Sequence, residues 1–175
     1  MLPILQFIVD TIASVLGGVL LLRFWMQAIR VRPPSSVAQF TFTLSDWLVK
    51  PLRRIVPGAG GYDWASLIGA FLVVLLATSV LLLAGWPAEH VFLLALGRFL
   101  KWIMYGFIAL LVIEAIFSWI NPHAPLAPFV HALNDPLLRP IRRVVPPIGG
   151  LDMSVLVAVV LLQIGLFLLR SVVPV

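Results

Sequence analysis

The sequence predicts an all-α membrane protein with four transmembrane helices, arranged as two parallel-oriented helix–loop–helix repeats, each with an interfacial amphipathic segment. Three observations lead to this fold class. Of the 175 residues, 62% are hydrophobic and 11% are charged, which leaves too few polar residues to coat a soluble domain of this length. The hydrophobic residues form long blocks that match membrane spans in length. The two halves of the chain also follow one pattern.

Four blocks are long and apolar enough to cross a membrane. They run from about Ile4 to Ile29, from about Trp64 to Trp86, from Phe92 or Phe99 to Ile120, and from about Met153 to Val172. No basic segment precedes the first block, and Asp10 interrupts it. We therefore interpret this block as a retained span rather than a cleaved signal peptide.

An internal duplication becomes visible when the second half of the chain is laid over the first at an offset of 89 residues. Between residues 45–67 and 134–156, 11 of 23 positions are identical. The matched pairs include Asp46/Asp135, Arg53/Arg142, Arg54/Arg143 and Asp63/Asp152. We therefore predict two units, residues 1–88 and 89–175, each with two spans joined by a basic loop.

The basic residues predict how the chain sits in the membrane. Because each unit contains two spans, both basic loops must emerge on the same side. That side carries eight Lys and Arg residues: Arg30, Arg32, Lys50, Arg53, Arg54, Arg139, Arg142 and Arg143. The other side carries Arg98, Lys101 and Arg170. The positive-inside rule then places the loops in the cytoplasm and both termini outside.

The first half of each loop has the hydrophobic spacing of an amphipathic helix. Apolar residues recur at helical intervals around Phe40, Leu44 and Trp47, and again around Val130 and Leu133. Each stretch is too short to span a bilayer, which favours a helix in the interface with its apolar face in lipid. Packing of the two loops against each other is the alternative. Pro51 and Pro140 are expected to end these helices.

The prolines stand within the basic motifs Lys50-Pro51-Leu52-Arg53-Arg54 and Arg139-Pro140-Ile141-Arg142-Arg143. Arginine binds phosphate through a planar fork of donors, so anionic lipid head groups suit these motifs. We take Lys50, Arg53, Arg54, Arg139, Arg142 and Arg143 as candidate lipid- or partner-binding residues. Alternatively, these cations do no more than fix the topology.

The spacing shared by the two loops ends in Asp63 and Asp152, which stand where the next span begins. A carboxylate there caps free backbone N–H groups and complements the positive end of the helix dipole. We therefore expect both aspartates to be helix caps; an ion pair with the nearby arginine is the alternative.

Ionisable residues inside spans are costly, about 2.5–3.5 kcal/mol each at a helix centre by insertion scales. Applying the repeat offset to Arg23 leads to Val112, two positions from Glu114. The two charges should lie at similar depth, and we predict that they form an ion pair between the first and third spans. The alternative is that Arg23 extends to the interface and Glu114 faces water. Asp10 and Gln163 are candidates for a polar path.

Several site classes find no support in the sequence. The chain has no cysteine, which removes thiolate chemistry and Cys-ligated metals, and it has no nucleophile–base set, HExxH motif or phosphate loop. We therefore expect no enzyme activity, cofactor or metal. His123 and His131 leave haem handling as a minor alternative. Because the basic residues lie beside membrane spans, we do not expect nucleic-acid binding.

The second loop resembles the signature of the YggT (YlmG-like) family of small integral membrane proteins. The resemblance rests on residues 135–143, on residues 146–154, on Ser118-Trp119-Ile120-Asn121-Pro122 and on Gln163. It implies a bacterial inner-membrane protein with chloroplast relatives. Roles associated with relatives include osmotic or alkali-cation stress tolerance, cell-division-site organisation and assembly of a thylakoid cytochrome complex. The family offers no accepted catalytic residues.

Together these features favour a non-enzymatic inner-membrane scaffold, or an assembly or stress-tolerance factor. It would present its paired Arg-rich loops to the cytoplasmic leaflet and bind anionic lipid, a membrane-protein partner or a second copy of the chain. The alternative is a small ion channel or transporter component in osmotic or cation homeostasis that uses Asp10, Arg23, Glu114 and Gln163.

Overall fold

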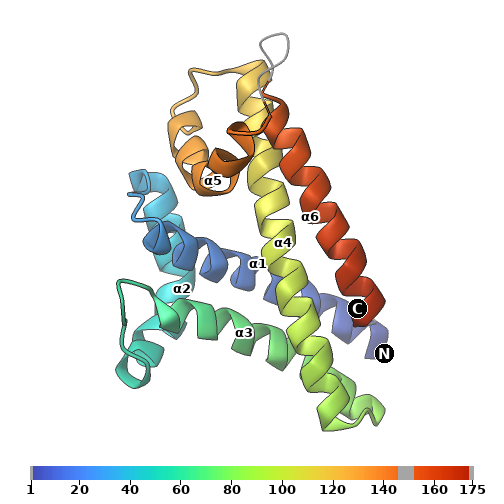
Figure 1. The fold of residues 1–175 in the computed structure, drawn as a ribbon. Helices are drawn as coiled ribbons and strands as arrows, with labels where there is room; N and C mark the ends of the chain where they lie inside the picture. The colour runs from blue at the N-terminus through green and yellow to red at the C-terminus, as the bar shows by residue number, and fades with distance from the viewer. Residues whose placement is uncertain (1, 146–151, 174–175) are drawn as a thin grey trace.

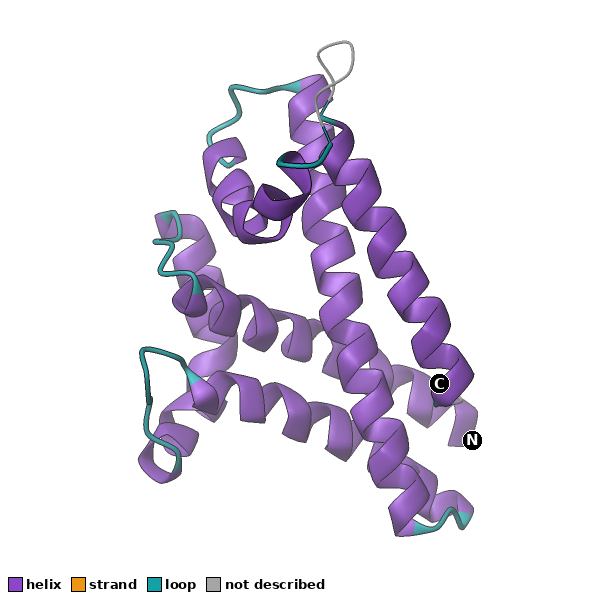
Figure 2. Ribbon diagram, viewed as in Figure 1, coloured by secondary structure: helices purple, strands orange, loops and turns teal. Residues whose placement is uncertain are grey.

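The computed structural model describes residues 2–145 and 152–173, in which the regular structure is helical apart from one isolated bridge between Ala59 and Tyr62. The helices in chain order are α1 (Leu2–Ala28), α2 (Ser35–Ile55), α3 (Trp64–Ser79), the 3-10 helix η1 (Val80–Ala84), α4 (Ala88–Ile120), α5 (Ala127–Arg142) and α6 (Met153–Val172). Figure 1 and Figure 2 show how they are arranged.

Four of these segments are long and apolar enough to cross a membrane, which confirms the predicted fold class. They comprise Ile4–Ala28, Trp64–Ala84, Ala88–Ile120 and Met153–Val172. The third span begins at Ala88, earlier than the sequence indicated. Arg98 does not interrupt the helix, because it forms an ion pair with Asp10. At 1.5 Å per residue, α4 is about 50 Å long and exceeds a hydrocarbon core of about 30 Å.

The spans form two antiparallel pairs, α1 with α3 and α4 with α6, and the second pair crosses the first obliquely (Figure 1). The amphipathic helices α2 and α5 each lie at the end of their own pair that is remote from the chain termini (Figure 1). A side-chain hydrogen bond joins the two halves between α1 and α5, where the indole N–H of Trp25 donates to the backbone carbonyl of Leu133 at 2.9 Å.

The larger core lies between α1, α2 and α3, and small residues dominate it. Its buried members are Ala13, Leu20, Val49, Ala65, Ala70, Val73 and Ala77. Because lipid chains are as apolar as these side chains, span association depends on close packing, which small residues allow. Gly17 contributes in the same way: an added Cβ would overlap the indole of Trp102 on α4. The core between α4, α5 and α6 is smaller and centres on Leu111, Leu138 and Ala158.

The helices α2 and α5 occupy the predicted amphipathic segments, but they use their apolar residues differently. One face of α2 is buried through Thr41, Ser45 and Val49, while Phe40 and Trp47 face outward. On α5, by contrast, the main apolar residues are buried against the α4–α6 pair: Val130, Leu133 and Leu138. Only α2 therefore combines a packed face with an outward aromatic face.

The expectation that proline ends these helices is wrong. Pro51 lies inside α2, which continues to Ile55, and Pro140 lies inside α5. Proline deprives the helix of one N–H donor. The turn that follows Pro51 is nevertheless held, because Leu52 packs on the core and Arg53 is bonded to Asp63.

Candidate functional site

A buried charge cluster, which we call the first cluster, joins the three helices of the first half. Arg23 on α1 is only 5% exposed. Its Nη1 donates to Ser45 Oγ at 2.6 Å and to Asp46 Oδ1 at 2.7 Å, and its Nε lies 3.5 Å from Asp63 Oδ2. The guanidinium also lies over the ring of Phe42, 4.8 Å from its centroid. These contacts offset the cost of burying the charge.

Asp63 lies at the centre of this cluster and is 1% exposed. It precedes α3 and accepts hydrogen bonds from the backbone N–H and the hydroxyl of Ser66 at 3.4 and 2.6 Å. Arg53 donates to both carboxylate oxygens, from Nε at 3.2 Å and from Nη2 at 2.6 Å. Burial alone would raise the pKa of Asp63, but the bonds from Arg53 and Ser66 outweigh it and hold that pKa below its usual value.

Asp46 carries the second acidic charge of the first cluster. It pairs with Lys50 at 2.9 Å, one helical turn along α2, as well as with Arg23. The hydrogen bonds from Lys50 and from Arg23 lower the pKa of Asp46.

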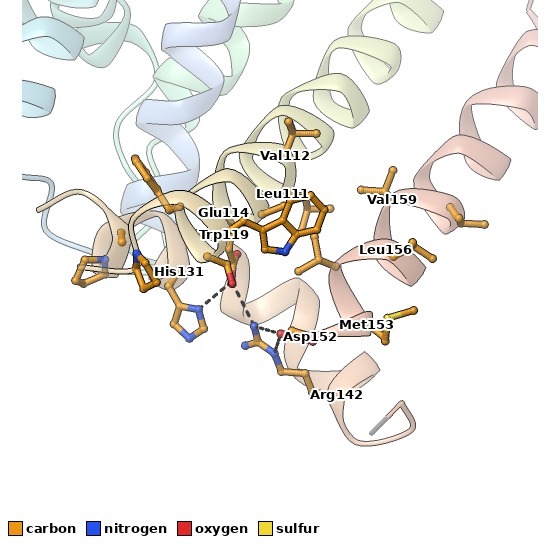
Figure 3. Close-up of a pocket in the computed structure, with 18 residues that line it drawn as sticks. Leu111, Val112, Glu114, Trp119, His131, Arg142, Asp152, Met153, Leu156 and Val159 are labelled. Atoms are coloured by element: carbon orange, nitrogen blue, oxygen red, sulfur yellow. Dashed lines mark hydrogen bonds and ion pairs between the residues drawn. The ribbon is translucent and has the colours of Figure 1, made fainter. Parts of the chain in front are cut away.

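The second cluster joins α4, α5 and the start of α6 (Figure 3). Glu114 on α4 is 9% exposed, and its Oε1 lies 2.9 Å from His131 Nδ1 and 3.3 Å from Arg142 Nη2. Arg142 also donates to Asp152 Oδ2 from Nε at 2.8 Å. The other oxygen of Glu114, Oε2, is buried without a hydrogen-bond partner among the described residues.

Asp152 precedes α6 as Asp63 precedes α3. It accepts a hydrogen bond from the backbone N–H of Ser154 at 3.0 Å and another from the Ser154 hydroxyl. Burial would raise the pKa of Asp152, but its bonds from Ser154 and Arg142 bring the pKa below the usual value.

The predicted ion pair between Arg23 and Glu114 is wrong, because each residue is paired within its own half of the chain. Arg23 bonds to Asp46, and Glu114 bonds to His131 and Arg142. The repeat offset places the two residues at similar depth, but Glu114 stands two positions from Val112, so the offset does not give the direction in which Glu114 leaves its helix. Both charges face the amphipathic helix of their own half, α2 for Arg23 and α5 for Glu114.

The arginine pair of each loop divides into one bonded and one unbonded residue. Arg53 bonds to Asp63 and Arg142 to Asp152. Arg54 and Arg143 are exposed and form no ion pair with any residue in the described ranges. Lys50 and Arg139 are exposed and make ion pairs one turn away within their own helices, Arg139 with Asp135 at 2.7 Å.

Asp10 and Gln163, the two residues proposed for a polar path, do not contact each other in the described structure. Asp10 on α1 pairs with Arg98 on α4 at 2.6 Å, and Arg98 also donates to Thr78 on α3 at 3.3 Å. The sequence contained a signal for this pair, since the repeat offset takes Asp10 to Phe99, next to Arg98. Gln163 is exposed on α6 and makes no side-chain hydrogen bond within residues 2–145 and 152–173.

The two loop histidines have different contacts. His131 is bonded to Glu114, whereas His123 donates from its backbone N–H to the side-chain oxygen of Asn121 at 3.2 Å. Across the part of the chain that the structure describes, no group of three or more acidic, histidine or cysteine side chains is arranged to hold a metal ion.

Comparison with known proteins identifies the family of the chain. The CCB3/YggT family model matches residues 2–84 and 93–173. A Vibrio alginolyticus protein named "uncharacterized protein in proC 3′ region" is 33% identical over 182 residues, which cover 97% of this chain and 95% of the relative. "Uncharacterized protein YggT" of Escherichia coli K12 is 34% identical over 168 residues, covering 91% and 86%. No solved structure matches the chain. With family matches in both halves and relatives along nearly its full length, the chain belongs to the CCB3/YggT family.

Proposed function

We propose that the protein is a non-enzymatic scaffold of the bacterial inner membrane, serving assembly or stress tolerance, which binds anionic lipid or a membrane-protein partner through its basic loops. The observation that carries the proposal is the outward face of α2. This face combines large apolar side chains with a cation that no described residue pairs. Its apolar members are Phe40, Leu44, Trp47 and Ile55, and Arg54 borders them.

The two kinds of side chain have separate roles in this proposal. Trp47 is 64% exposed and Ile55 is 79% exposed, and transfer of a side chain of this size into an apolar phase contributes about 1.5–3 kcal/mol. The apolar residues therefore anchor the helix whatever the head group. An arginine near an anionic surface adds about 1 kcal/mol and provides the selectivity for charge.

The free cations are the residues on which lipid selectivity should depend. Arg53 and Arg142 are engaged with Asp63 and Asp152, so their loss would disturb the fold as well as the surface. Arg54 and Arg143 are exposed in equivalent positions and are the cleaner test residues.

The proposed orientation has the basic loops in the cytoplasm and both termini outside. The loop side carries eight Lys and Arg residues, and the opposite side carries three, Arg98, Lys101 and Arg170. This leaves the excess of Lys and Arg on the loop side, which the positive-inside rule assigns to the cytoplasm. The cysteine-free chain allows a direct test. A cysteine at Pro57 should resist a membrane-impermeant maleimide in intact spheroplasts, and one at Ala88 should react.

Lipid selectivity is tested by reconstitution into nanodiscs with equal phosphatidylglycerol and phosphatidylcholine, followed by mass spectrometry of the lipid retained on the purified protein. Wild type should be enriched in phosphatidylglycerol. Arg54→Gln and Arg143→Gln should each reduce the enrichment about fivefold, the equivalent of about 1 kcal/mol. Arg170→Gln, at the far end of α6, is the matched control. Equal lipid composition in wild type and in the double variant contradicts lipid recognition by these loops.

Partner binding calls for a separate measurement in cells. A photo-crosslinking amino acid at position 47 should give protein adducts, and one at Trp86, at the other end of the first pair, should not. Adducts of equal yield at both positions would indicate random collisions in the membrane and would remove the partner-binding part of the proposal.

A further inference from the structure

We propose that the second half of the chain holds a binding site for a phospholipid with a primary ammonium head group, as in phosphatidylethanolamine. The site is a cavity of about 790 Å³ between α4, α5 and α6 (Figure 3). It is separate from the outward face of α2, and it calls for a head-group ammonium, whereas that face calls for a net negative head group. The inference therefore does not rest on the function proposed above.

The cavity has an apolar wall and a polar end, which match the acyl chains and the head group of a lipid. Its wall on α4 and α6 is apolar, with Val112, Leu156 and Val159 among the lining residues, and Trp119 borders it with 72% of its surface exposed. Its charged and titratable lining residues are Glu114, His131, Arg142 and Asp152 (Figure 3), and Ser118 adds a hydroxyl. Tryptophan is typical of the depth at which head groups meet acyl chains.

At the polar end, one oxygen of Glu114 lacks a hydrogen-bond donor among the described residues. The Glu114 side chain is 11% exposed, and its Oε1 already faces His131 and Arg142, whereas no donor in the described structure reaches its Oε2. A buried carboxylate oxygen without a partner is costly, so a donor from a ligand would be favoured here.

Comparison with the first half shows which donor is missing. The position of Arg23 corresponds to Val112 in the second half, and the position of Phe42 corresponds to His131. The first cluster contains three cations and two carboxylates: Arg23, Lys50 and Arg53 with Asp46 and Asp63. Around the second cluster there are two arginines and three carboxylates, Arg139 and Arg142 with Glu114, Asp135 and Asp152, together with the titratable His131. The second half thus lacks the built-in cation that fills this place in the first.

This charge balance selects the head group. An ammonium supplies one positive charge and three N–H donors, which suits Glu114 Oε2. A phosphatidylcholine head group carries the same charge but no N–H donor. A phosphatidylglycerol head group would add negative charge to a cluster that already has an excess of carboxylates. The acyl chains would then lie against the wall formed by α4 and α6.

The first test uses the wild-type protein. Protein in nanodiscs of mixed lipids of identical acyl chains is extracted and examined by native mass spectrometry for retained lipid. The lipids form a series in which the amine of phosphatidylethanolamine is methylated once, twice and three times. Retention should fall at each step as N–H donors are lost, by about tenfold over the series. A flat series overturns the proposal.

The second test uses two substitutions in the cavity. Glu114→Gln should remove most of the preference for phosphatidylethanolamine over phosphatidylcholine. Val112→Arg places the cation of the first half at the equivalent position and should exclude the lipid amine, with tryptophan fluorescence used to confirm an intact fold. Arg54→Gln is the control and should leave this preference unchanged while lowering phosphatidylglycerol enrichment. If neither cavity substitution changes the preference, or if phosphatidylglycerol is retained in a Glu114-dependent manner, the assignment is wrong.

Discussion

Replacement of Arg53 by glutamine should destabilise the protein much more than replacement of its neighbour Arg54. The two residues are adjacent in one basic motif and carry the same charge. Arg53 donates to both oxygens of the buried Asp63, whereas Arg54 is exposed and has no ion-pair partner within the described residues. The comparison therefore separates the loss of a specific contact from the loss of a positive charge.

The expected magnitude follows from what Asp63 retains. Without Arg53, its carboxylate keeps the bonds from Ser66 and the approach of Arg23 Nε at 3.5 Å. Breaking a fully buried ion pair costs about 3–5 kcal/mol, and a hydrogen bond to a charged group is worth about 1.5–3 kcal/mol. Because the Arg53 side chain is 45% exposed, solvent screens part of the interaction. We expect a loss of about 1.5–3 kcal/mol for Arg53→Gln and less than about 0.5 kcal/mol for Arg54→Gln.

The measurement is thermal unfolding in one detergent, followed by tryptophan fluorescence at a fixed heating rate because membrane proteins often unfold irreversibly. For a chain of this length the expected loss corresponds to a fall in midpoint of roughly 3–12 °C for Arg53→Gln. Arg142→Gln and Arg143→Gln form the same comparison in the second half. Equal midpoints for Arg53→Gln and Arg54→Gln would refute the division of each arginine pair into a bonded and a free residue.

Three further predictions concern the packing, the far end of the spans and the pH response. Gly17→Ala should cost about 1–3 kcal/mol in thermal unfolding, because its Cβ would overlap Trp102, while Gly18→Ala has open space and should be neutral. Arg98→Gln should cost about 2 kcal/mol by leaving Asp10 unpaired, and adding Asp10→Asn should restore part of that loss; no restoration would show that the pair is not coupled. The lowered pKa of Asp63 means that its stabilisation is complete above the unfolded value of about 3.9 and is lost as the pH falls through the lower folded value. The midpoint temperature of unfolding should therefore fall as the pH is lowered below about 4, and this fall should be smaller in Asp63→Asn.

Hydrophobicity and helical spacing were sufficient to predict the spans and the loop helices. The block from Met153 to Val172, for example, is the helix α6 that the structure contains. Periodicity could not reveal how α2 and α5 differ, because both segments carry enough apolar residues for one face. The difference lies in their tertiary contacts. Leu133 and Leu138 are buried against neighbouring helices, whereas Phe40 and Trp47 are left outside. The two-unit organisation remains a prediction.

The partners of the charges were harder to predict, and Arg23 illustrates the physical reason. A repeat offset gives the depth of a residue along its helix, but the angle around the helix decides which element the side chain meets. Arg23 and Glu114 have similar depth and face different helices, so the predicted pair does not form. For Asp10 and Arg98, depth and direction agree, and the pair exists.

The same geometry explains why a doubled arginine does two different things in each loop. Consecutive residues of an α-helix point about 100° apart, so two adjacent arginines cannot both reach one buried carboxylate. In α2, Arg53 meets Asp63 and Arg54 is thereby directed to the surface. The motif thus links the fold to its exposed charge: the residue that holds the start of the next span also orients its neighbour outward. If surface charge alone mattered, exchanging the arginine of position 53 for a neutral residue and adding one elsewhere on the exposed face would be harmless. The buried carboxylate of Asp63 predicts that it is not.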